Sequence, residues 1–269
     1  MDLRGASAES LAVLTDELGG PAGDATVAAT LADDLFSVAH TLRTEGSLRR
    51  FVTDGSVPAQ AKQGLVGEVL AGKIGEAALG IVSTAVGRRW TATRDLADSL
   101  EHLSVVAAVK SAGSDTARLS DELFTVASTI TATPSLRDAL SDPVRSTADK
   151  SQLVQALLAG RALPATVTLV QQALSGSYRT VSAALDDYQK TVAEVHGQSV
   201  ATVRVARELT EADARRLEQA LSSQYGRPIH LNLVVDPAVL GGIRVEIGDD
   251  VIDGTVSSRL DDARRHIAG

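Results

Sequence analysis

The spacing of hydrophobic positions along the chain changes near residue 198. Before it, apolar residues recur every three or four positions, which is the spacing of one face of an α-helix. After it, residues 201–205, 229–235 and 243–247 alternate between apolar and polar, a period of two that only an extended strand satisfies. The chain is therefore predicted to be mainly α, with a C-terminal α/β domain in which a small mixed sheet packs with helices.

Local signals divide the first part of the chain into helices. Pro58 suits the start of a helix, and Gly72 suits its left-handed end. A later helix is marked in the same way: Ser146 or Thr147 caps its start, and Gly160 ends it. On this basis helices are predicted over residues 7–18, 25–44, 58–71, 75–87, 93–111, 116–131, 147–159, 165–175 and 180–196.

An internal repeat relates two parts of this helical region. The segment DLFSVAHTLRTEGSLRRFVTD, from Asp34, is echoed by ELFTVASTITATPSLRDALSD, from Glu122, at a constant spacing of 88 positions. The match continues without a gap to Gly72 and Gly160. Self-similarity of this length predicts that a helical unit has been duplicated, giving two tandem related bundles.

The repeat suggests three domains. They are an N-terminal helical bundle over residues 1–110, a second, duplicated bundle over residues 111–197 and the C-terminal α/β domain over residues 198–269. Because the spacing places residues 94–106 opposite residues 6–18, the helix near residues 93–110 is expected to close the first bundle and open the second. Such a shared helix would join the two bundles rigidly.

The C-terminal domain contains a dense run of turn signals. Asp236-Pro237 ends a strand, since proline has no N–H to give to a sheet. Gly241-Gly242 allows a turn that is too tight for a side chain. Gly248-Asp249-Asp250 then predicts a hairpin into Val251-Ile252.

Two helices are expected around these strands. Thr210 caps the first, which ends at Gly226 and Pro228. The last has one apolar stripe, formed by Val256, Leu260, Ala263 and Ile267.

Composition excludes several functional classes. Apolar residues make up 44% of the chain but aromatic residues only 3%, which is typical of cores in which Ala, Val and Leu hold helices close together. The absence of cysteine rules out disulfides, thiolate metal sites and a cysteine nucleophile. A formal charge of −8 argues against a nucleic-acid partner, because such binding depends on neutralising phosphates.

No pattern in the sequence predicts catalysis, a cofactor or a metal. The five histidines, at positions 40, 102, 196, 230 and 266, stand alone without metal-ligand spacing. Leu240-Gly241-Gly242-Ile243 precedes a strand, whereas a dinucleotide-binding loop follows one. Asp249, Asp250 and Asp253 are acidic but lack the other ligands of a calcium loop, so a solvated turn with Asp–backbone hydrogen bonds is the better interpretation.

The C-terminal block is similar to a known family. The run DPAVLGGIRVEIGDDVIDGTVSSRL resembles the C-terminal domain of the delta subunit of bacterial F-type ATP synthases, whose mitochondrial counterpart is the oligomycin-sensitivity-conferring protein. The duplicated bundle resembles the actinobacterial form of that subunit. The structural positions that carry the signature are Asp236, Gly241, Gly242, Gly248, Asp253 and Gly254.

The resemblance implies a non-catalytic connector in the peripheral stalk, present in one copy per complex. In the family, the N-terminal bundle accepts the N-terminal helix of an alpha subunit of the catalytic head in a groove between two helices, and the C-terminal domain holds the b subunit. The candidate groove residues here are Leu11, Leu14, Leu18, Leu79, Val82 and Val86. The candidates for contact with b are Val239, Leu240, Leu260 and Ile267. In both sets, burial in the core is the competing interpretation.

Other readings of the sequence are weaker. A helical-repeat adaptor unrelated to ATP synthase would share the repeat but has no reason to carry the C-terminal block. An enzyme would require a set of titrating polar groups that the sequence does not show. The acidic N-terminus lacks a signal-peptide core and no stretch is apolar enough to cross a bilayer, so we expect no direct membrane insertion and a location on the cytoplasmic face of the cell membrane through partners.

Overall fold

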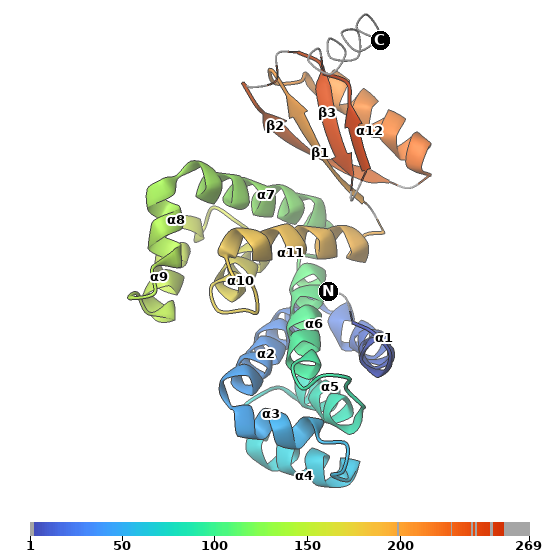
Figure 1. Ribbon diagram of the computed structural model, residues 1–269, viewed down its shortest axis with the longest axis vertical. Coiled ribbons are helices and arrows are strands. Elements are labelled where there is room, and N and C mark those ends of the chain that lie inside the picture. Colours follow the sequence, from blue (N-terminus) through green and yellow to red (C-terminus); the bar gives the residue numbers. More distant parts are fainter. Residues whose placement is uncertain are drawn as a thin grey trace, which may run out of the picture. The chain divides into compact units, whose positions relative to one another are not determined.

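The computed structural model describes residues 3–197, 199–226, 228–237, 239, 241–247 and 250–255. The chain forms two compact units, Met1–Thr191 and Val192–Gly269. The first is helical, and the second contains a four-stranded sheet (Figure 1). The expected fold class, mainly α with a C-terminal α/β domain, is confirmed.

The helices of the first unit follow one another through short connections. The first five α-helices are α1 (Ala6–Gly19), α2 (Ala25–Thr44), α3 (Gly46–Thr53), α4 (Ala59–Leu70) and α5 (Glu76–Gly87). The next six are α6 (Asp95–Ser111), α7 (Thr116–Ala132), α8 (Pro134–Ser141), α9 (Thr147–Leu158), α10 (Pro164–Ala173) and α11 (Val181–Val195), whose last residues belong to the second unit.

The structure reproduces the repeat in its helix ends. Gly72 and Gly160, 88 positions apart, take left-handed φ angles of 69° and 72° after α4 and α9. The carboxylate of Asp34, on α2, accepts a hydrogen bond from the backbone N–H of Gly75 at the start of α5 (2.8 Å). Its equivalent on α7, Glu122, accepts from the N–H of Leu163 at the start of α10, also at 2.8 Å. Equivalent residues therefore cap equivalent helices in both copies.

Replacing Glu122 with glutamine is expected to lower the free energy of unfolding by about 1 kcal/mol at neutral pH. Burial raises the pKa of the Glu122 carboxyl, but hydrogen bonds from Thr166 and Leu163 and the pairing with Arg118 outweigh it, so this pKa lies below its ordinary value of 4.5. A carboxyl with a depressed folded pKa stabilises the fold above its unfolded pKa, and this stabilisation is lost as the pH falls through the folded value. The difference between wild type and variant should therefore shrink in acid.

Urea unfolding followed through Trp90, the only tryptophan of the chain, measures this difference at neutral and acid pH. Asp138→Asn is the control, because the Asp138 side chain is exposed and its nearest contact to Arg137 is a long 3.8 Å. A Glu122→Gln effect that stays constant between about pH 7 and about pH 3 would contradict the assignment.

Helix α6 lies at the centre of the first unit. It packs along α2 and also contacts α1 and α5 of the first copy, and α7 and α10 of the second (Figure 1). Nearly its whole circumference is buried, from Leu96 to Val109. Its contacts to both copies agree with the expected shared helix, while the division into domains 1–110 and 111–197 stays a prediction.

Two short helices, α3 and its repeat equivalent α8, are absent from the sequence-based expectations. Helix α3 occupies Gly46–Thr53, where the glycine and the short length gave no periodic signal. The guanidinium of Arg49 donates to the carbonyls of Leu42 (3.0 Å) and Arg43 (2.9 Å), which are end groups of α2. Arg49 thus helps to fix α3 by satisfying the last carbonyls of α2, and the buried side chain of Val52 anchors the helix as well.

The second unit contains a mixed sheet with the strand order β2-β1-β3-β4. The strands are β1 (Ser199–Val205), β2 (Ile229–Val235), β3 (Ile243–Ile247) and β4 (Asp250–Asp253). Strand β1 pairs with β2 in parallel and with β3 antiparallel, and β3 and β4 form the expected antiparallel hairpin. The parallel pair needs a crossover, which helix α12 (Glu211–Tyr225) supplies.

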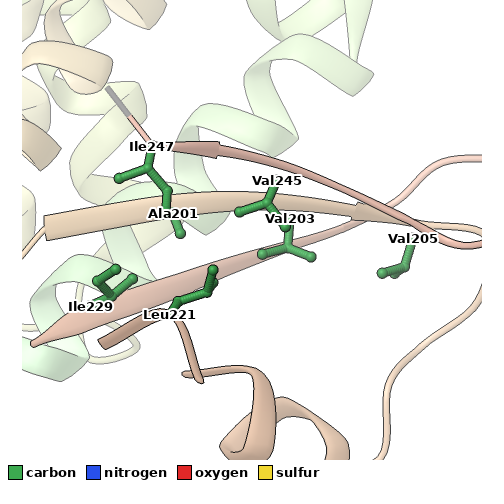
Figure 2. Packing of buried hydrophobic residues seen from close by; sticks show 7 residues of the cluster. All are labelled: Ala201, Val203, Val205, Leu221, Ile229, Val245 and Ile247. Atoms are coloured by element: carbon green, nitrogen blue, oxygen red, sulfur yellow. The ribbon is translucent and has the colours of Figure 1, made fainter. Parts of the chain in front are cut away.

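One face of the sheet forms the core of the second unit. Figure 2 shows buried side chains of β1, β2 and β3 gathered with Leu221 of α12. Strand β1 alternates strictly between buried and half-buried positions, as its sequence predicts. Thr210 caps α12 by accepting from the N–H of Asp213 (3.2 Å), and Gly226 ends it at φ 67°. The predicted last helix, with Leu260 and Ile267, lies outside the described residues.

Candidate partner-binding surfaces

The first candidate surface is the pair of helices α1 and α5. The two helices contact each other, and the Thr84 hydroxyl of α5 donates a hydrogen bond to the Glu17 carboxylate of α1 (3.1 Å). The Ser10 hydroxyl of α1 donates to the carbonyl of Arg89 just after α5 (2.9 Å). Polar contacts on both sides thus hold the helices side by side.

The six groove candidates divide into two groups. Four of them are buried within the chain itself: Leu14, Leu18, Val82 and Val86. Leu11 and Leu79 are half-buried, which leaves part of each side chain open to another molecule. For the four buried residues the structure favours the competing interpretation, a place in the core, and a partner on this surface would contact Leu11 and Leu79 first.

The second candidate surface belongs to the C-terminal domain. Of its four predicted residues, Val239 is half-buried, whereas Leu240, Leu260 and Ile267 lie outside the described residues. Sequence reasoning missed three exposed apolar side chains: Val235 (47% exposed) at the end of β2, and Val251 (55%) and Ile252 (37%) on β4. These residues lie on β2 and β4, the two edge strands of the sheet, and only the strand order shows that these strands are at the edges.

The glycine pattern of the C-terminal block is explained by a close backbone approach. Gly242 has φ 82°, and a Cβ placed on it would lie only 2.9 Å from the Cα of Thr255 and closer still to the carbonyl oxygen of Gly254. The N–H of Gly254 donates to the carbonyl of Ile243 (2.9 Å). Gly241 has φ 154°, and Gly248 lies outside the described residues. The double glycine therefore allows two backbone segments to cross.

The two acidic signature residues each form a hydrogen bond with a backbone group of another residue. Asp236 follows the last residue of β2, and its N–H donates to the carbonyl of Val205 (2.8 Å). The carboxylate of Asp253 accepts from the N–H (3.0 Å) and hydroxyl (2.7 Å) of Thr255, and these hydrogen bonds hold its pKa below the ordinary value. Asp253 thus forms the Asp–backbone turn that the sequence favoured over a cation site.

Comparison with known proteins decides the family. A family model described as ATP synthase delta (OSCP) subunit matches residues 104–267. The chain is also 62% identical over 268 residues to the ATP synthase subunit delta of Nocardioides sp. (strain ATCC BAA-499 / JS614), covering 99% of this chain and 98% of the relative. The chain belongs to the ATP synthase delta (OSCP) subunit family.

Other delta subunits match over similar lengths. That of Kineococcus radiotolerans is 45% identical over 88% of this chain and 87% of the relative. That of Streptomyces avermitilis is 39% identical over the full length of both chains. The expected role, that of a non-catalytic stator subunit in the peripheral stalk of the F-type ATP synthase, is confirmed by this membership, and nothing supports the unrelated adaptor.

The range of the family match bears on the two copies. The match begins at residue 104, within α6, and therefore covers the second copy and the C-terminal domain but not α1 to α5. The groove candidates from Leu11 to Val86 lie entirely outside it. The relatives above, in contrast, match almost from end to end, so they share the additional N-terminal helices.

The delta (OSCP) family belongs to a membrane-bound complex. In the part of the chain that the structure describes, no helix has both the length and the apolar character that crossing a bilayer requires. Within the same residues, no group of three or more His, Cys, Asp or Glu side chains is arranged to hold a metal ion.

Proposed function

We propose that this subunit ties the catalytic head to the b subunit on the cytoplasmic side of the membrane, one copy per complex. The bundles take the N-terminal helices of alpha subunits, and the C-terminal domain takes the end of b. Membership of the delta (OSCP) family is the observation that carries the proposal. A static tether prevents the head from turning with the rotor, so that ion flow is spent on ATP synthesis.

The packing of the first unit suits a tether that must resist torque. The helices are held together by small and medium aliphatic side chains such as Ala28, Leu35 and Ala107, all buried. Close-packed interiors of this kind have low compressibility. The contacts of α6 to helices of both copies would pass a torque from one bundle to the other without a flexible linker.

The division of labour between the bundles follows from the repeat. In the first copy, Leu79 is the half-buried residue of α5 on the candidate groove, and Val167 of α10, 88 positions later, is half-buried as well. We propose residues 1–110, 111–197 and 198–269 as the three functional domains. By the repeat, α6 and α10 of the second bundle correspond to α1 and α5 of the first, but α6 is buried on nearly all sides, so α10 is the helix that leaves part of this surface open.

Leu79→Asp is expected to weaken attachment of the purified subunit to the catalytic head by about tenfold or more, because a charge would enter an apolar contact that excludes water. Attachment is measured by titrating labelled subunit onto heads that lack it. Val167→Asp is the matched variant in the second copy, and comparing the two shows which groove carries more of the affinity.

Val144→Asp serves as the control for added charge, since Val144 is 90% exposed between α8 and α9. Each variant must unfold in urea as the wild type does. Full attachment of Leu79→Asp, Leu11→Asp and Val167→Asp, with normal stability, would show that these grooves do not hold the head. Binding of a soluble b fragment should be unchanged in all of them.

A further inference from the structure

A polar cavity opens beside α6, on the side facing α11. Its volume is about 300 Å³. It lies between α6, residues 177–178 and residues 187–191 of α11, and all of these residues belong to the first unit. The residues that line it and enter the argument are Asp98, Glu101, Ser177, Tyr178, Asp187 and Tyr188. The size is at the lower end of ligand sites, which suits one side chain rather than a cofactor.

The charges around the cavity do not balance. Three carboxylates line it, those of Asp98, Glu101 and Asp187. The Arg43 guanidinium of α2 pairs with the first two, at 3.2 Å from Asp98 and in closer contact with Glu101. Asp187 accepts a short hydrogen bond from the Tyr178 hydroxyl, and within the described residues no cationic side chain pairs with it. His102 also lines the cavity, and even if its imidazole is counted as a cation beside Arg43, the three carboxylates leave the wall net negative.

A buried hydroxyl at the cavity has no partner. Tyr188 is 1% exposed, and among the described residues its hydroxyl forms no hydrogen bond. Its ring meets the Tyr178 ring edge to face, with centroids 5.8 Å apart. Burial and the charge of Glu101 raise the pKa of Tyr188, so the hydroxyl keeps its proton and faces acidic groups. A buried hydroxyl without a partner is costly, and a ligand that bonds to it would remove this cost.

We propose that this cavity is a receptor site for an arginine side chain of a partner polypeptide. A guanidinium would place its N–H donors against Asp187, Asp98 and the Tyr188 hydroxyl oxygen, and it can stack against the exposed part of the Tyr178 ring. Its charge offsets the unbalanced carboxylates. The site is distinct from the apolar grooves and does not depend on which of them holds the head.

A metal ion fits the cavity less well than a guanidinium. Within the described residues the carboxylates are not grouped closely enough to ligate one ion, and each already holds a hydrogen-bond donor or a guanidinium. A planar donor with several N–H groups can reach separated acceptors, whereas an ion of short coordination distance cannot.

The test uses the full chain and N-acetyl-L-arginine methylamide as the probe, with backbone amide NMR shifts of Ser177 and Tyr178 as the readout. Saturable shifts are expected with the arginine probe. N-acetyl-L-citrulline methylamide, the neutral isostere, should bind at least about tenfold more weakly. The variant Asp187→Asn should lose a similar factor for the arginine probe, and Tyr188→Phe should lose a smaller one.

Three outcomes would overturn the site. A cavity that holds water only gives no saturable shift up to about 50 mM probe. Equal binding of the arginine and citrulline probes shows that charge is not recognised. Unchanged affinity in Tyr188→Phe shows that the buried hydroxyl takes no part. If Asp187→Asn does not fold, the isostere comparison on wild type and the Tyr188→Phe variant decide.

Discussion

Replacing Arg43 with methionine is expected to lower the free energy of unfolding of the helical unit by about 3–5 kcal/mol. The Arg43 side chain is 19% exposed and that of Glu101 only 3%, so the two charges are largely removed from water. The Glu101 carboxylate also accepts from the N–H of Ser177, 3.1 Å from each oxygen. Without Arg43, a buried carboxylate would lose its counter-charge, which costs far more than the loss of a surface pair.

Urea unfolding followed by Trp90 fluorescence measures this effect, because Trp90 lies in the first unit, where its indole N–H donates to the carbonyl of Ala85 (2.9 Å). Arg145→Ala is the control, since Arg145 pairs with Asp142 on the surface of the same unit and such pairs contribute about 0–1 kcal/mol. The double variant Arg43→Met/Glu101→Met should recover part of the loss. A loss below about 1 kcal/mol for Arg43→Met alone would contradict the assigned role.

Gly242→Ala is expected to destabilise the C-terminal domain by about 2–4 kcal/mol. Two effects add: φ is 82°, and the new Cβ would meet the backbone of Gly254 and Thr255. Backbone atoms cannot rotate away as a side chain does, so the crossing of the two segments would have to open. Amide hydrogen exchange of β1 and β3 measures the change, because these strands pair with each other at the centre of the sheet.

Gly226→Ala separates the two effects. Gly226 has φ 67°, and no atom lies within 4 Å of a Cβ placed there, so this variant carries only the strain of the left-handed backbone, about 1–2 kcal/mol. If Gly242→Ala costs no more than Gly226→Ala, the close approach in the structure is not what the glycine serves. The helical unit should be unaffected by either change.

The helices that were predicted well are those whose ends are marked by side chains. Helix α9 begins after Ser146, which accepts from the N–H of Asp149 (3.1 Å), and the glycine at its far end is left-handed as expected. Strand β2 occupies Ile229–Val235, the predicted range, because alternation and proline both limit it. Local chemistry of this kind can be read without knowing the tertiary structure.

The buried charges could not be predicted. Nothing near Arg43 or Glu101 in the sequence distinguishes them from the solvated Arg and Glu residues elsewhere. The two residues pair with each other, and they lie 58 positions apart in the chain. The same limit applies to the groove candidates. The spacing of apolar residues predicts which face of α1 is apolar. It does not predict that Leu14 faces a neighbouring helix while Leu11 stays partly open to a partner, because that depends on how α5 and α6 pack against α1.

A shortened chain that began at α6 would not be a smaller version of this subunit. Leu96, Leu100 and Leu103 are 0% exposed, and α2 is the helix packed most extensively against α6. Without α1 to α5, that apolar surface would be exposed to water and would promote aggregation.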